Sequence, residues 1–243
     1  MRIAQVYVII QGILTCLLDQ RQPMTQIVLV RHAVNDFVKT GKLAGWTPEV
    51  HLNEEGVAQA EALGNRLADV PIDRLYASPL ERTMETADAI RRHHPDLEIR
   101  QHPGIGEVRY GEWEGQAIAS LQTRKMWHVI QEYPSRASFP NGETMREVQA
   151  RAVNAIEELA ARHPRELVVV VSHADLIKMI LAHFLGMHLD NFQRIIVSPA
   201  SISSLSLGYG RPYVATVNDT AHIAQMERER RAAEQAQPVT TEA

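Results

Sequence analysis

The stretch "VLVRHAVND", residues 28–36, decides the predicted fold, because a run of strand-forming apolar residues ends directly in Arg31 and His32. A second stretch, "ELVVVVSHAD" (166–175), repeats the pattern: an apolar run ends in His173 and leads into a helical segment. Apolar runs bounded by polar residues are typical of strands that are buried on both faces. Ligands of open α/β sheets bind at the carboxyl ends of parallel strands. We therefore expect His32 and His173 at one edge of a sheet.

Strand-like and helical segments alternate along the rest of the chain. Proline is well tolerated in a first helical turn, so "SPLERTMETADAIRRHH" is expected to start a helix at Ser78-Pro79 that His94-Pro95 ends. The other expected elements are a helix over 51–70 with Asn53 as its cap, strands over 74–78 and 97–100, a glycine-rich loop over 102–115, helices over 116–133 and 143–163, and a hairpin near the sheet edge over 201–219. This alternation predicts an α/β fold, a three-layer α/β/α sandwich with a mostly parallel central sheet.

The chain has 243 residues and no linker rich in Pro, Gly or Ser, which favours a single domain over 24–223. Residues 1–23 form an apolar N-terminal extension that lacks the cleavage site of a convincing export signal. Because "MTQIVLV" opens directly on the first strand, we expect Met24 to be the natural start. The last residues, 224–243, are poor in large apolar side chains and are expected to form a frayed helix and a flexible tail.

Composition excludes several classes of protein. Hydrophobic residues make up 45% and charged residues 22% of the chain, which is ordinary for a globular protein. The formal charge is −4 and the basic residues form no stripe, so we expect no nucleic-acid partner. The N-terminal apolar run is too short for a comfortable membrane span, so no membrane partner is expected either. One cysteine, Cys16, excludes a disulfide framework and fits a cytoplasmic protein, whereas the oligomeric state is not indicated.

Five side chains could form a phosphate site at the predicted sheet edge: Arg31, His32, Arg82, Glu107 and His173. Guanidinium groups match phosphate oxygens, and an unprotonated imidazole nitrogen can attack phosphorus. Glu107, in the glycine-rich loop, can protonate a leaving oxygen, and this chemistry requires no metal. Each residue alone also has a simpler explanation, with Arg82 as a solvated helix arginine, Glu107 as a loop carboxylate and His173 as a strand-end histidine.

The joint pattern resembles the histidine phosphatase superfamily, in its phosphoglycerate mutase-like branch. The resemblance covers residues 27–223 and rests on several blocks that occur in the family's order: "LVRHAVND", "LNEEGVAQA", "ASPLERTMETA", "GIGEVRYGEWEG", "FPNGETMREVQAR", "VSHADLIKMIL" and "VNDTAHI". It implies that His32 becomes phosphorylated, that Arg31, Arg82 and His173 bind the phosphate, and that Glu107 is the proton donor. It implies no metal and no other cofactor.

The chain also departs from the family's usual pattern. Ala33 follows the predicted nucleophile where the family usually has glycine, and Val38 stands where asparagine is common. We expect Asn35 to take over that substrate contact. The family's "FTGW" is replaced by 43–46, "LAGW", so one hydroxyl contact to phosphate is not expected.

The segment between the glutamate loop and the "PNGE" block decides the expected reaction. Only residues 115–139 lie there, whereas the cofactor-dependent mutases of the family carry a long insertion. We therefore expect hydrolysis of a small phosphorylated metabolite. A cofactor-dependent phosphoglycerate mutase or other phosphomutase is one alternative, and a non-catalytic, phosphate-binding regulatory module is another. The segment, with Arg124, Trp127, His128 and Tyr133, forms either a cap that selects the leaving group or a helix packed on the sheet through Trp127 and Tyr133.

Overall fold

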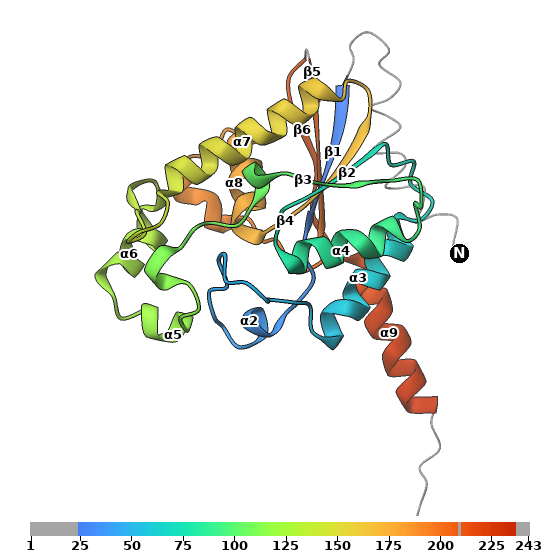
Figure 1. Cartoon of the computed structure of the whole chain (residues 1–243), viewed down its shortest axis with the longest axis horizontal. Coiled ribbons are helices and arrows are strands. Elements are labelled where there is room, and N and C mark those ends of the chain that lie inside the picture. The colour runs from blue at the N-terminus through green and yellow to red at the C-terminus, as the bar shows by residue number, and fades with distance from the viewer. Residues whose placement is uncertain (1–23, 209, 237–243) are drawn as a thin grey trace, which may run out of the picture.

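A single six-stranded sheet forms the centre of the protein, in a computed structural model that describes residues 24–208 and 210–236 (Figure 1). The expectations for residues 1–23, including Cys16, lie outside the described residues. The strand order is β3-β2-β4-β1-β5-β6, and the strands are β1 Met24–Arg31, β2 Arg74–Ala77, β3 Ile99–Gln101, β4 Leu167–Ser172, β5 Ile202–Gly208 and β6 Tyr213–Asp219.

The sheet is mostly parallel, as predicted. β1, β2, β3 and β4 pair in parallel, whereas β5 and β6 form an antiparallel hairpin at one edge. The register of β1 and β4 pairs Arg31 with Ser172, and the His32 amide donates to the Ser172 carbonyl at 2.9 Å. His32 and His173 therefore leave adjacent strands at the same carboxyl edge, which confirms the central expectation from the sequence.

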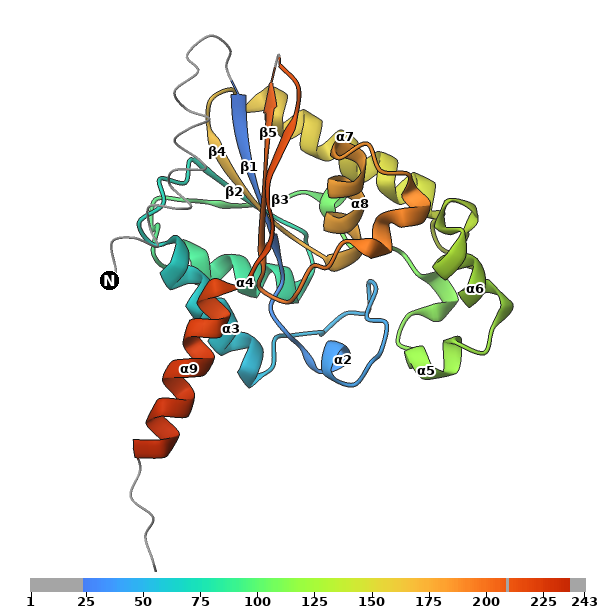
Figure 2. The ribbon, with the colours of Figure 1, turned by 180° about the vertical axis from the view of Figure 1, so that it is seen from behind.

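Helices cover both faces of the sheet, so the protein is the predicted three-layer sandwich (Figures 1 and 2). One layer holds α7 Met145–Arg162 and α8 Ala174–Phe184, and the other holds α3 Glu54–Leu67, α4 Glu81–Arg91 and α9 Ala221–Ala236. All of β4 is buried, because Val168 and Val170 pack in the first cluster of apolar side chains and Val169 and Val171 in the second. Alternate residues of one strand thus contact opposite layers.

Two helices begin where side chains satisfy their first N–H groups. The predicted cap Asn53 accepts a hydrogen bond from the Gly56 amide at 2.9 Å and starts α3. Thr144 and Glu147 form a capping box at the start of α7. Such caps stabilise a helix by about 1 kcal/mol, and these two help to fix the ends of helices that line both sides of the sheet.

Two predicted helices have different bounds in the structure. α4 begins at Glu81 rather than at Pro79, because Leu80 is still extended (φ −80°, ψ 144°), and it ends at Arg91. The single helix expected over 116–133 is divided into α5 Ile118–Leu121 and α6 Lys125–Glu132. Arg124, with φ −85° and ψ 141°, interrupts it.

The remaining elements are short, apart from the last helix. α2 Asp36–Lys39 follows the carboxyl end of β1, and short 3-10 turns lie at Pro103–Ile105, Gly111–Trp113, Pro134–Arg136 and Leu189–Arg194. The segment expected as a tail begins inside α9, whose side chains at 227–235 are all exposed. Within 24–208 and 210–236, no helix is long and apolar enough to cross a bilayer.

Candidate active site

His32, the predicted nucleophile, is buried at the end of β1 and has one ring nitrogen fixed. Its Nδ1 lies 2.7 Å from the Ala33 carbonyl oxygen. A carbonyl can only accept, so Nδ1 carries the proton and Nε2 of the neutral ring keeps its lone pair. Burial, together with the charges of Arg82 and Arg31, lowers the pKa of His32 well below its usual value. The ring is therefore neutral at physiological pH, as a nucleophile must be.

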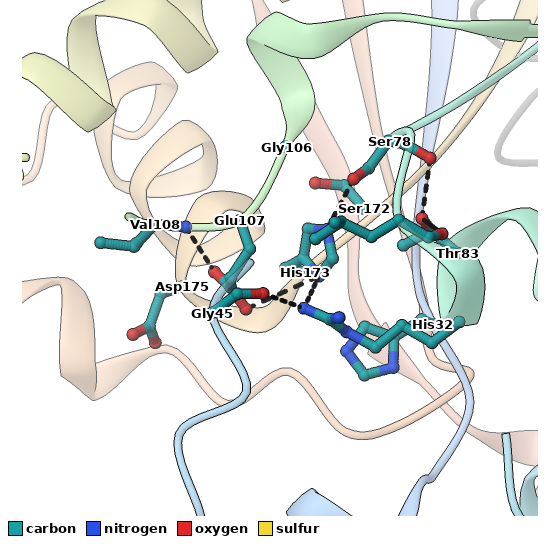
Figure 3. A network of polar contacts seen from close by, with 12 residues as sticks. His32, Gly45, Ser78, Thr83, Gly106, Glu107, Val108, Ser172, His173 and Asp175 are labelled. Atoms are coloured by element: carbon teal, nitrogen blue, oxygen red, sulfur yellow. Dashed lines mark hydrogen bonds and ion pairs between the residues drawn. The ribbon is translucent and has the colours of Figure 1, made fainter. Parts of the chain in front are cut away.

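His173 faces His32 across a distance of 5.2 Å between ring centroids (Figure 3). Its Nε2 lies 2.8 Å from Ser78 Oγ, and its Nδ1 lies 3.4 Å from Nη2 of Arg82 and 3.6 Å from a carboxyl oxygen of Glu107. Burial and the charge of Arg82 lower the pKa of His173 well below its usual value. The contact with Glu107 is therefore one between a neutral ring and a carboxyl group rather than an ion pair.

Of the two predicted phosphate-binding arginines, Arg82 is buried and Arg31 is half-buried, and neither pairs with a carboxylate among the described residues. Arg82, in the first turn of α4, is 1% exposed and donates to the Gly45 carbonyl at 2.8 Å, and Arg31 donates to the Val197 carbonyl at 2.7 Å. Nε and Nη1 of Arg82 and Nε of Arg31 have no hydrogen-bond partner among the described residues. Burial lowers the pKa of both guanidinium groups. Arg82 lies beside His173 and Arg31 directly precedes His32, so these N–H groups are available to an anion near the two histidines.

Asn35, predicted to contact substrate, has a structural role that the sequence prediction did not include. Its Oδ1 accepts from the Val38 amide at 2.9 Å and caps α2. Its Nδ2 is buried and has no hydrogen-bond partner in the described part of the chain. Asn35 therefore brings a further free donor to the same end of β1.

Glu107, the predicted proton donor, is placed beside His173 by the loop that follows β3 (Figure 3). Its Oε1 accepts from the Val108 amide at 2.9 Å. Burial raises its pKa to about 7, and the negative charge of Asp175 adds to this effect while Arg82 and Arg31 oppose it. A carboxyl group with this pKa populates both its protonated and its ionised form at neutral pH, so it can both donate and accept a proton.

The structure accommodates the departures from the family pattern at positions 33 and 43–46. The Ala33 methyl packs with Ala60, Ala89 and Ala200, and the Ala33 amide donates to Thr86 Oγ1 at 3.1 Å. The 43–46 segment contributes the Gly45 carbonyl to Arg82 and the Trp46 indole N–H to the Glu107 carbonyl at 2.7 Å.

The predicted cap consists of α5 and α6. Trp127 is partly buried and stacks on Trp113, with 6.5 Å between ring centroids, which agrees with a packing role for this residue. Tyr133 is 55% exposed, so the packing explanation does not hold for it. Arg124 and His128 are also exposed.

Several residues that complete the site were not identified from the sequence. They are Ser78, which contacts His173; Asp175, which raises the pKa of Glu107; and Trp46, Glu143 and Arg151, which contact the loop that carries Glu107. All except Trp46 lie in the sequence blocks that carry the resemblance, which was the available signal. In the described ranges, no group of three His, Cys, Asp or Glu side chains is arranged to hold a metal ion.

Comparisons with known proteins agree with this fold and with the family that the sequence blocks resemble. Residues 27–220 match the family model of the histidine phosphatase superfamily (branch 1). Phosphoserine phosphatase 1 of Hydrogenobacter thermophilus is 30% identical over 83% of this chain and 96% of its own length. A metal-independent phosphoserine phosphatase of Arabidopsis thaliana is 28% identical over 65% of this chain and 67% of its own. The solved structure of Bacillus stearothermophilus YhfR superposes with a TM-score of 0.77 at 27% identity, over 82% of this chain and 99% of that one.

The fold, together with the family match and the relatives, identifies an enzyme of the phosphoric monoester hydrolase class. The chain belongs to the histidine phosphatase superfamily, as its sequence blocks predicted.

Proposed function

We propose that this protein hydrolyses small phosphate monoesters without a metal ion, through a phosphohistidine intermediate on His32. The observation that carries the proposal is a set of buried N–H donors on Arg31, Asn35 and Arg82 that have no partner in the described part of the chain, near a histidine whose Nε2 bears no proton. Each such donor costs about 1–3 kcal/mol while unsatisfied. A phosphoryl group would accept from them, and the positive charge of the two guanidinium groups would replace that of a metal ion.

The proposed reaction has two steps. In the first, Nε2 of His32 forms a bond to phosphorus as the bond to the leaving oxygen breaks, and Glu107 gives that oxygen its proton. In the second, a water oxygen bonds to phosphorus, Glu107 takes the proton of the water, and the bond between Nε2 and phosphorus breaks. Arg31, Arg82 and His173 stabilise the charge on the phosphoryl oxygens in both transition states.

The leaving group is proposed to be a small alcohol of a phosphorylated metabolite. Two relatives bear the name phosphoserine phosphatase, so O-phosphoserine is the first substrate to test. Hydrolysis is favoured over transfer because only α5 and α6 separate the glutamate loop from the segment that leads into α7. A mutase must keep water from its phosphohistidine, which requires a more closed site.

The test is hydrolysis of O-phosphoserine and of an aryl phosphate in the presence of a chelator. Wild-type protein is expected to turn over, and His32→Ala to lose turnover by at least about 10⁴-fold, since removal of a nucleophile costs this much or more. His93→Ala, an exposed histidine at the end of α4, is the control and is expected to leave the rate unchanged.

Further measurements separate the parts of the proposal. Mass spectrometry of protein quenched in alkali is expected to find phosphate on His32. Turnover by His32→Ala would reject the nucleophile, and loss of wild-type activity on chelation would reject metal independence. Stimulation by bisphosphoglycerate together with isomerised product would favour the mutase alternative.

A further inference from the structure

The backbone of the loop that carries Glu107 is held by hydrogen bonds from side chains of other elements. We define residues 104–108 as the proton-donor loop. Four consecutive carbonyls, those of residues 104–107, each accept hydrogen bonds from side chains: Gly104 and Gly106 from Arg151, Ile105 from Ser172, and Glu107 from both Arg151 and Trp46. The position of this backbone therefore depends on side chains of α7, β4 and the segment before α3.

Arg151, on α7, supplies three of these bonds with one guanidinium group. Its Nη1 donates to the Gly104 carbonyl at 3.1 Å and to the Gly106 carbonyl at 2.8 Å, and its Nη2 donates to the Glu107 carbonyl at 2.8 Å. A planar guanidinium group can reach several acceptors at once, whereas a lysine ammonium is a single point charge. The proposed reaction assigns no role to Arg151.

Glu143 fixes the orientation of the Arg151 side chain. Its Oε1 accepts from Nε of Arg151 at 2.6 Å, and its Oε2 accepts from Nη2 at 2.9 Å. The same Oε2 accepts from the Arg109 amide at 2.9 Å, just beyond the loop. Both partners are mostly buried, at 23% and 18% exposure. The pair therefore joins the start of α7 to both ends of the proton-donor loop.

We propose that Arg151, oriented by Glu143, is a positioning residue that sets the place of the Glu107 carboxyl group beside His173 and the leaving oxygen. This inference rests on the proposed function, because it assigns Arg151 a part in the proton transfer by Glu107. A displacement of a catalytic group by about 1 Å can cost about 10²-fold in rate. The side-chain hydrogen bonds of Arg151 go to the loop carbonyls and to Glu143, and none of them goes to the Glu107 carboxyl group, His32 or His173.

The test compares two leaving groups in the Arg151→Lys variant. Serine alkoxide is a poor leaving group that needs a proton, whereas dinitrophenolate is stable as an anion and does not. We expect kcat/KM for O-phosphoserine to fall by about 10²-fold and that for dinitrophenyl phosphate to stay within about threefold. Arg162→Lys is the matched control, because Arg162 is an exposed arginine on the same helix that pairs with Glu158, and it is expected to change neither value.

A second measurement does not depend on activity. Amide hydrogen exchange in peptides that cover the proton-donor loop is expected to become faster in Arg151→Lys and to stay unchanged in Arg162→Lys. Equal losses of kcat/KM on both esters would contradict the proposal, because they would show that Arg151 stabilises the protein in general. Unchanged amide exchange of the loop would also overturn it. If the wild-type protein cleaves neither ester, the proposed function fails, and loop exchange still decides whether Arg151 holds the loop.

Discussion

The two halves of the active site are built in different ways. The phosphate half, which consists of Arg31, His32, Arg82 and His173, comes from the ends of β1 and β4 and the first turn of α4. The backbone around His32 is joined to the sheet, since its amide donates to the Ser172 carbonyl. The proton-donor loop follows the short strand β3 and is held through its carbonyls by side chains.

This difference teaches how one enzyme can separate two requirements. Binding the phosphoryl group needs fixed charges, and the buried sheet edge provides them without adjustment. In the proposed reaction, proton transfer depends on the leaving group and on pH, and it is assigned to a carboxyl group whose loop is held by a few side chains. Variants in the two halves should therefore respond differently to the leaving group.

Among the variants that distinguish the two halves, the largest expected effect is that of Glu107→Gln on an alkyl phosphate. Glutamine cannot donate a proton, so kcat/KM for O-phosphoserine is expected to fall by about 10²–10⁴-fold, the usual contribution of a general acid. The loss on dinitrophenyl phosphate is expected to be much smaller. Steady-state kinetics on both esters measure this, and an equal loss on the two would contradict a proton-donor role.

Arg82→Met is expected to lower kcat/KM by about 10²–10³-fold, the effect of losing a donor to developing charge. Because the phosphoryl group is the same in every substrate, the loss should be equal for O-phosphoserine and dinitrophenyl phosphate. Arg91→Met, which removes an exposed arginine of the same helix, is the control. A loss confined to the alkyl ester would contradict the assignment of Arg82 to phosphate binding, because it would then respond to the leaving group as Glu107 is expected to.

The smallest expected effect is a shift in pH dependence. Glu107 has a pKa of about 7 and must be protonated to donate, so kcat/KM for O-phosphoserine should fall as the pH rises through about 7. Asp175→Asn removes a negative charge that raises this pKa, so the fall should begin at lower pH. Asp96→Asn, an exposed acid in the turn before β3, should leave the profile unchanged. A profile of Asp175→Asn that matches the wild type would show that Asp175 does not influence Glu107.

The sequence predicted the phosphate half better than the proton-donor loop. "VLVRHAVND" and "ELVVVVSHAD" place a histidine directly after an apolar strand, and parallel pairing then requires both rings at one edge. Glu107 was identified from its motif, but nothing local in the sequence indicates what holds its loop. Arg151 is 44, 45 and 47 residues away along the chain from the three carbonyls that it contacts.

The helix boundaries also show that features set by neighbouring residues are easier to predict from the sequence than features set by the rest of the fold. The cap at Asn53 was predicted because the residue and the amide it accepts from are close in sequence. The prediction of one continuous helix over 116–133 was wrong. The spacing of apolar residues alone did not reveal that Arg124 is extended and divides the segment.

The sequence by itself determined the α/β class, the sheet edge at which His32 and His173 meet, and the chemistry available there, because strand periodicity and residue type are local properties of the chain. Only the tertiary structure decided that Nδ1 of His32 is the protonated nitrogen, that the buried donors of Arg31 and Arg82 have no partner within 24–208 and 210–236, and that burial beside Asp175 raises the pKa of Glu107 to about 7. The physical reason is that hydrogen bonding and desolvation depend on neighbours that folding brings from distant parts of the chain.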